Sequence, residues 1–157
     1  MTRVAFIALT AWIAALGLSA CSTDTSQLSV GYQRYTFTCC QASDTQRTWV
    51  PGETLTLHWI SEPAGTTPDS SAAHITLTAV LTGPYPNANA LKAGGSPRVT
   101  LSATPIVTTD RANMNAASNI ALPTSLPAGF YNVANSMELV SSKASGATVI
   151  QVSPAGG

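Results

Sequence analysis

Residues 51–59 read PGETLTLHW, and this segment decides the expected fold. Pro51 and Gly52 are typical of a turn, and the residues after them alternate between polar and apolar side chains. Successive side chains of a β-strand point to opposite faces, so a period of two predicts a strand with one buried face. We expect Trp59 to be a core residue on the buried face of this strand.

The same alternation recurs along most of the chain. Apolar residues alternate with threonine, serine or other polar residues in six further segments, which are residues 35–38, 75–81, 98–103, 130–133, 137–140 and 148–152. Threonine suits a half-buried sheet surface, and the chain has 21 threonines but only two lysines, a composition that favours sheets over exposed helices. We therefore expect six to eight short strands.

Two segments predict short helices between these strands. Residues 87–93 precede Gly94 and Gly95, which are typical of a helix end. Residues 111–118 follow Asp110, which we expect to cap a helix at this position. Neither segment is long enough to determine the fold.

Short strands separated by turn signals predict an all-β fold, an immunoglobulin-like (Ig-like) antiparallel β-sandwich with one or two short helices in insertions. Residues 51–59 resemble the second-strand region of bacterial Ig-like modules. Residues 126–133 resemble the Pro-Ala-Gly-aromatic-Tyr motif at the start of a late strand in such modules. Residues 74–79 and 98–103 resemble each other, but no third copy occurs, so we expect residues 32–157 to form a single Ig-like domain.

Length and charge restrict the function classes. The chain has 157 residues, of which 45% are hydrophobic and 9% charged, and its seven basic residues balance its seven acidic ones. A chain of this length and composition usually forms one domain. The lack of net charge gives no reason to expect binding to nucleic acid or electrostatic capture by anionic lipid.

The first twenty residues have the layout of a secretory signal peptide. Arg3 precedes an apolar run over residues 4–18, and small residues follow that run. A transmembrane helix needs about 20 apolar residues, and this run is shorter, so we do not expect an anchor that spans the membrane. Residues 1–20 are expected to be removed during export.

The end of this segment, Leu18-Ser19-Ala20-Cys21, resembles a bacterial lipobox. The resemblance implies that a diacylglycerol thioether forms on the sulfur of Cys21 and that signal peptidase II cuts before this residue. It also implies acylation of the new amino terminus, typically by palmitate. Each buried methylene contributes roughly 0.8 kcal/mol, so two or three acyl chains hold a protein at a membrane. The implied location is the outer face of the cytoplasmic membrane, and the Ala- and Thr-rich composition is similar to that of actinobacterial proteins.

Residues 21–31 are mostly polar and predict a flexible tether. Fully extended, a tether of about ten residues holds a domain up to roughly 30 Å from the membrane. The alternative is that part of this stretch adds an edge strand. Without residues 1–20 the chain keeps six basic and seven acidic residues, so the mature domain is nearly neutral.

Adjacent cysteines at Cys39 and Cys40 are unusual in an exported protein. Neighbouring strand residues point to opposite faces, with Cα atoms about 3.8 Å apart, so pairing the two thiols requires a distorted turn. Three interpretations are open: a vicinal disulfide that acts as a structural clip or hydrophobic contact plate, two thiols without a role, and a redox switch or soft-metal site. A copper or zinc site needs more ligands. The candidates for these are His58, His74, Met114 and Met137.

No catalytic motif accompanies these features, because the chain lacks GxSxG, HExxH, a phosphate-binding loop and a nucleotide fingerprint. His58 alternates with apolar residues and is expected at the surface. A pocket that holds a histidine beside a carboxylate would support an enzyme. Trp49 and Tyr85 fall in expected loops, where aromatic side chains are free to contact a partner.

The sequence therefore predicts a lipid-anchored, non-enzymatic module of the cell envelope. We expect it to bind or position another envelope component through loops near residues 39–49 and 83–95. The alternative is an extracytoplasmic redox or soft-metal (copper or zinc) protein that uses Cys39 and Cys40. No cofactor, catalytic residue or metal ligand is assigned from the sequence.

Overall fold

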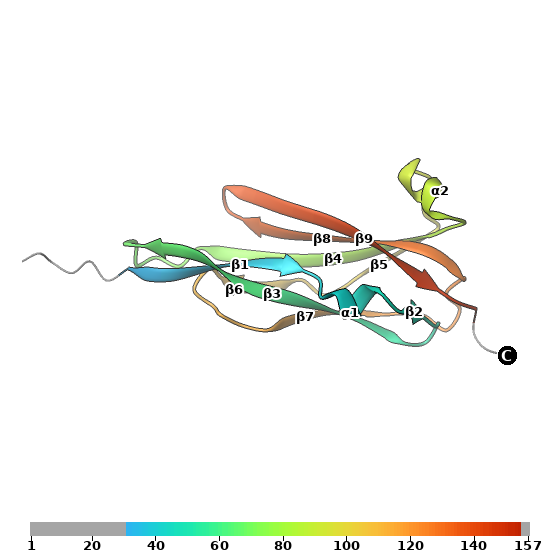
Figure 1. Cartoon of the computed structure of the whole chain (residues 1–157), viewed down its shortest axis with the longest axis horizontal. Coiled ribbons are helices and arrows are strands. Elements are labelled where there is room, and N and C mark those ends of the chain that lie inside the picture. The colour runs from blue at the N-terminus through green and yellow to red at the C-terminus, as the bar shows by residue number, and fades with distance from the viewer. Residues whose placement is uncertain (1–30, 155–157) are drawn as a thin grey trace, which may run out of the picture.

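The structure is a computed structural model that describes residues 31–154, and most of these residues lie in strands (Figure 1). The strands are β1 (Tyr32–Cys39), β2 (Thr48–Trp49), β3 (Thr54–Thr67), β4 (His74–Tyr85), β5 (Val99–Ser102), β6 (Ile106–Thr109), β7 (Ala116–Ala121), β8 (Gly129–Leu139) and β9 (Ser142–Val152). Two short helices, α1 (Ala42–Thr45) and α2 (Ala88–Lys92), interrupt them. The prediction of a mostly β chain with short helices is confirmed.

The expected signal peptide, the lipobox with Cys21 and the expected tether up to residue 30 lie outside the described residues. Over residues 31–154, no helix is both long enough and apolar enough to cross a membrane.

The strands form two sheets. The three-stranded sheet has the order β1-β3-β7, and all its pairs are antiparallel. The six-stranded sheet has the order β2-β9-β8-β4-β5, and β6 also pairs with β4. Only β2 and β9 run parallel, and they pair at just two positions. Figure 1 shows the two sheets extended along the same long axis, with the β8–β9 hairpin rising away from β1 and with α2 standing off one end.

The core lies between the sheets because each long strand turns alternate side chains inward. Leu55 and Leu57 of β3 pack with Leu81 of β4 and with Tyr131 and Val133 of β8, and all five side chains are fully buried. A second buried cluster toward the other end contains Phe37, Trp59, Ile75, Leu77, Ala116 and Met137. The prediction that Trp59 is a core residue is confirmed.

The predicted helix over residues 111–118 is wrong. Arg111 lies in a turn, and residues 116–121 form β7, which pairs with β3. Small side chains suit β7 because Ala116 lies opposite Trp59, and the Ser118 hydroxyl accepts a hydrogen bond from Trp59 Nε1 at 2.9 Å. Tertiary contacts with the large indole ring thus outweigh the weak local helix preference of this segment.

Asp110 does not cap a helix; it connects three segments instead. Its carboxylate accepts hydrogen bonds from Arg34 Nε at 2.7 Å and from the Ala73 amide at 2.8 Å. Its main-chain carbonyl accepts a hydrogen bond from the Tyr35 amide at 2.7 Å. The side chain is almost fully buried, so these donors replace the water that a carboxylate would otherwise need.

The other predicted helix is confirmed as α2, which is capped where the Asn87 side chain accepts a hydrogen bond from the Ala90 amide at 2.8 Å. The expected strand segments 130–133 and 137–140 fall in the single strand β8, except that β8 ends at Leu139 and Val140 lies in the turn to β9. The motif over residues 126–133 forms the start of that strand. There the Tyr131 hydroxyl donates to the Pro127 carbonyl at 2.7 Å, and burial raises the pKa of Tyr131.

Candidate functional site

The chain crosses from one sheet to the other between β1 and β2. β1 ends at Cys39 in the three-stranded sheet, and β2 begins at Thr48 in the six-stranded sheet. The one-turn helix α1 fills the step between them. Asp44 of α1 is almost fully buried, and its carboxylate accepts hydrogen bonds from the His58 amide at 2.7 Å and the Gln41 amide at 3.2 Å. This carboxylate ties the crossover to β3.

Cys39 and Cys40 lie at the start of the crossover and are joined by a disulfide, with a cis peptide bond between them. Both residues are half-buried. Cys39 packs against both buried clusters, whereas Cys40 packs against the cluster that contains Leu55 and Leu57. The pair therefore caps the apolar interior where β1 leaves its sheet.

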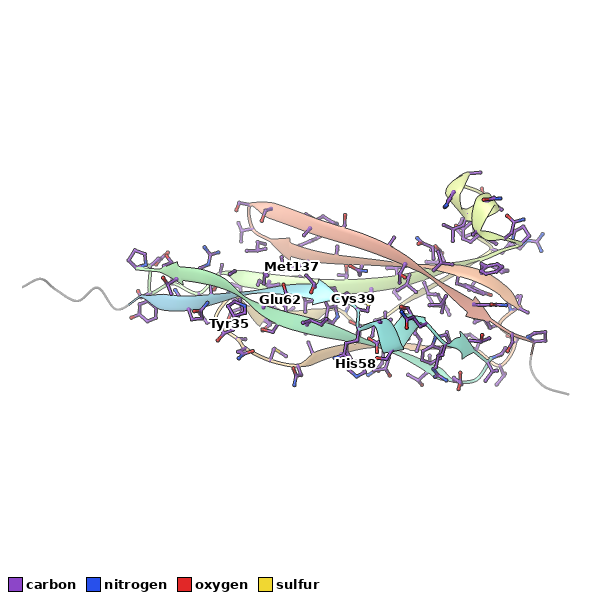
Figure 2. All side chains as sticks on the ribbon, viewed as in Figure 1. Tyr35, Cys39, His58, Glu62 and Met137 are labelled. Carbon is purple, nitrogen blue, oxygen red and sulfur yellow. A yellow bond between two sulfur atoms is a disulfide. The ribbon has the colours of Figure 1, made fainter. Side chains whose placement is uncertain are left out.

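An apolar cleft opens beside the disulfide. It has a volume of about 160 Å³ and is lined by Phe37, Thr38, Cys39, Trp59, Asn135, Met137, Ala144, Ser145 and Gly146. One wall is thus β1, and the other wall is the β8–β9 hairpin. Figure 2 shows Cys39 and Met137 on these two facing elements. The sulfur of Met137 accepts a hydrogen bond from the Phe37 amide at 3.3 Å, which bridges the two walls.

A larger cleft, whose lining is more polar than that of the apolar cleft and which we call the polar cleft, lies against the other face of the same hairpin. It has a volume of about 580 Å³ and is lined by Thr78, Val80, Ala134, Asn135, Ser136, Lys143, Ser145, Gly146 and Ala147. Asn135, Ser145 and Gly146 line both clefts. Both faces of the hairpin are therefore hollowed at the same level of β9.

The fold brings only part of the proposed additional metal ligands together: Met137 and Met114 belong to or pack against the same buried cluster as Cys39, whereas His58 lies at the surface and His74 at the start of β4. Met137 shares the apolar cleft with Cys39. Met114 accepts a hydrogen bond from the Thr108 hydroxyl at 3.2 Å beside β6, and His74 pairs with Thr109 of β6. Over residues 31–154, no group of three or more His, Cys, Asp or Glu side chains is arranged to hold a metal ion.

His58 lies at the surface, as predicted, and its side chain is 46% exposed. Its ring atom Nδ1 lies 2.8 Å from Asp44 Oδ1. An ionised carboxylate can only accept, so in this pair Nδ1 carries the hydrogen and Nε2 stays available to solvent. An imidazole oriented by a carboxylate resembles part of a catalytic triad. However, none of the hydrogen bonds over residues 31–154 joins Nε2 to a serine, threonine or cysteine, and neither residue lines the two clefts at the β8–β9 hairpin.

The expectation that Trp49 is free to contact a partner is wrong. Its side chain is only 4% exposed, because β2 places it in the core and the guanidinium of Arg47 covers its ring at 3.4 Å. Tyr85 also lies in a strand rather than a loop and is only 8% exposed. Tyr85 lines a third cleft of about 390 Å³, which is formed by residues at the end of β4, in and after α2, and at Ala128.

One feature that the sequence did not predict is the unpaired edge of β9. β9 pairs with β8 over its whole length, from Ser142 to Val152, whereas β2 pairs only with Gln151 and Val152. The edge from Ser142 to Ile150 therefore has no neighbouring strand among residues 31–154. The only sequence signal was the small, nearly uncharged composition of residues 142–148, which resembles an ordinary loop.

The chain matches no protein-family model and no curated protein sequence. The residues assembled here therefore carry the functional interpretation by themselves.

Replacing Asp44 with asparagine is expected to lower the free energy of unfolding by about 1–3 kcal/mol, because the amide cannot accept from all the donors that surround the carboxylate. Urea denaturation followed by circular dichroism measures this loss. The matched control is Glu62→Gln, which removes an exposed carboxylate from the same strand as His58 and should change stability by less than about 0.5 kcal/mol. Equal effects of the two substitutions would contradict the role given to Asp44.

Proposed function

We propose that this protein is a lipid-anchored, non-enzymatic Ig-like module that binds or positions another component of a bacterial cell envelope. The observation that carries the proposal is the order of segments along the chain. A hydrophobic leader ends in Leu18-Ser19-Ala20-Cys21, a polar stretch of about ten residues follows, and a two-sheet body begins at Tyr32. This order suits a folded domain that is displayed at the outer face of the cytoplasmic membrane.

Strand order supports the Ig-like part of the proposal. In Ig domains, the first, second and fifth strands share one sheet, and the third, sixth and seventh strands share the other. The order β1-β3-β7 matches the former group, and the order β9-β8-β4-β5 matches the latter with one additional strand. β6 pairs with β4 rather than with β7, a departure from the simplest constant-type arrangement.

Tyr131 supplies a second, independent argument. Many Ig domains have a tyrosine near the start of the sixth strand whose hydroxyl bonds to the main chain a few residues upstream. Tyr131 lies near the start of β8, which takes the place of that strand, and its hydroxyl donates to the carbonyl four residues earlier. This contact fixes the turn that leads into the central strand of the larger sheet.

The buried polar groups also fit a binding module. The carboxylates of Asp44 and Asp110 accept hydrogen bonds from main-chain amides, and they also contact an imidazole (Asp44) and a guanidinium (Asp110). These contacts hold segments of the chain together. The Ser118 hydroxyl accepts a hydrogen bond from the indole of Trp59. These contacts serve the fold, which leaves the exposed surface, including the clefts at the β8–β9 hairpin, as the place for recognition.

The first test concerns the anchor. Replacing Cys21 with serine removes the sulfur that would carry the lipid, so the protein should move from the membrane fraction to the soluble fraction when cells are fractionated without detergent. Immunoblotting of the two fractions measures the shift. The matched control is the double variant Cys39→Ser/Cys40→Ser, which should remain in the membrane fraction. Full retention of Cys21→Ser at the membrane would contradict the proposal.

The second candidate function is an extracytoplasmic redox or soft-metal protein. One observation favours it: Met137 and Cys39, two sulfur-containing residues, line the same apolar cleft. Thiolates and thioethers are the ligands that select soft metals such as Cu(I). In the structure the two cysteines are joined, so metal binding would first require a two-electron reduction of the disulfide to two thiols.

Intact mass spectrometry of the mature protein separates these two candidates. A structural disulfide predicts a mass about 2 Da below that of the reduced protein, with no bound metal after exposure to Cu(I) or Zn²⁺ under mild reductant. A single equivalent of copper or zinc that survives gel filtration, and that Met137→Leu removes, would instead establish the soft-metal function.

A further inference from the structure

The unpaired edge of β9 presents hydrogen-bonding groups at alternate residues. The Ser153 amide donates to the Trp49 carbonyl at 2.9 Å, so the main chain at this residue faces β2. Residues of a strand in an antiparallel pair alternate between facing the partner and facing away from it. The register with β8 is continuous, so the main-chain groups of Lys143, Ser145, Ala147 and Val149 face outward beyond β2. None of these groups has a hydrogen-bond partner among residues 31–154.

By contrast, the edge of β1, which lies across the apolar cleft from β9, is covered by contacts with other segments. The Tyr35 amide donates to the Asp110 carbonyl, and the Phe37 amide donates to the Met137 sulfur. Natural sheets protect their edges with such contacts, or with charges, prolines and bulges. The unpaired part of β9 has one charge, Lys143, which forms an ion pair with Glu138 near the hairpin tip. Between Ala144 and Val149 the strand has no charged residue, no proline and no bulge, and the contact that α1 makes with β9 adds no main-chain hydrogen bond to this part of the edge.

The space beside this edge fits an added strand. Side chains of a strand alternate between the two faces of a sheet, and here each face opens onto a cleft. An added strand would place alternate side chains over the apolar cleft, which contains Phe37, Trp59 and Met137, and the others over the polar cleft. No described cleft adjoins the unpaired edge of β7.

The apolar cleft favours a strand from another protein over the β9 strand of a second copy of this chain, because the two differ in the side chains that they would place in the cleft. If two β9 edges paired, the residues that each would offer on the apolar side between Ala144 and Val149 are the small Ala144 and Gly146 and the polar Thr148. Gly146 has no side chain, and a Cβ there would approach the Asn135 Oδ1 atom to 3.1 Å. A cleft of about 160 Å³ is roughly five times the volume that one water occupies in the liquid, so it accommodates a side chain larger than methyl.

We propose that the β9 edge from Ala144 to Val149 docks an extended segment of another envelope protein by β-strand addition. The segment is uncharged where it pairs and alternates in polarity, with at least one leucine-sized or larger apolar side chain in the cleft beside the Cys39–Cys40 disulfide. Main-chain hydrogen bonds supply the affinity, and this apolar side chain supplies the specificity. The inference rests on the proposed function as a binding module and names its contact surface.

A phage-displayed library of linear nine-residue peptides tests the proposal. It is selected against the full chain, purified in detergent and immobilised through a tag at its C-terminus. We expect enrichment of uncharged sequences in which polar and large apolar residues alternate. Synthetic copies of the enriched peptides are then titrated against the protein, with binding followed by fluorescence polarisation.

Two substitutions at Ser145 provide the matched comparison. Ser145→Pro removes an outward amide and places a ring against the incoming strand, so affinity should fall about tenfold or more. Proline is tolerated on a strand edge where the amide bonds to nothing, so the melting temperature should stay close to that of the wild type. Ser145→Ala loses the same hydroxyl but keeps the amide, so affinity should stay within about twofold of the wild type.

A third variant tests the apolar cleft without altering the main chain. Ala144→Leu fills the cleft from β9 itself, so peptides with a large apolar residue at the cleft position should lose affinity. Peptides in which that residue is replaced with alanine should bind Ala144→Leu and the wild type with similar affinity. This comparison keeps the test decisive if Ser145→Pro fails to fold.

Three results would overturn the proposal. The library yields no enriched peptide, enriched peptides bind Ser145→Pro as tightly as they bind the wild type, or the wild-type chain forms a dimer that Ser145→Pro abolishes. The last result would assign the edge to a second copy. Failure of the membrane anchor is a separate outcome, because it is measured with Cys21→Ser and leaves peptide binding by the full chain unchanged.

Discussion

Between β1 and β2 the chain crosses from the three-stranded sheet to the six-stranded sheet, and this crossover determines how the edge of the larger sheet is covered. β1 must end in one sheet so that β2 can join the other, and the chain makes this step within about eight residues. The buried carboxylate of Asp44 holds the step against β3, and the Cys39–Cys40 disulfide lies at its start. Because the crossover consumes this length of chain, β2 supplies only two residues to the edge of the larger sheet. The open apolar cleft and the unpaired part of β9 follow from the short length of β2.

The sequence predicted the parts of the fold in which local pattern and tertiary packing agree. Ile75, Leu77 and Leu81 alternate in the sequence and are all buried in the structure, as the period of two requires. Prediction failed where packing outweighs local preference. Residues 111–118 were expected to form a helix after Asp110, yet Ala116 and Ser118 belong to β7, where their small side chains lie against Trp59. Asp110 looks like a helix cap, yet its partners Arg34 and Ala73 are distant in sequence.

The candidate site was only partly predictable for the same reason. Adjacent cysteines and a likeness to an export signal are readable from residues alone. In contrast, the cleft that unites Cys39 with Met137 requires β1 and β8 to come together, and these strands are about a hundred residues apart. Trp49 looked like an exposed loop residue because β2 is too short to show alternation, and Arg47 covers its ring. An unpaired edge is a property of sheet order, which no local pattern encodes.

Amide hydrogen exchange along β9, followed by nuclear magnetic resonance, measures whether the edge from Ala144 to Val149 is unpaired in solution. We expect the amides of Ser145 and Ala147 to exchange faster than those of Ala144 and Gly146 by roughly tenfold or more, because only the even-numbered residues bond to β8. Equal, strong protection of odd and even amides in the monomeric protein would mean instead that this edge is already paired and cannot receive another strand.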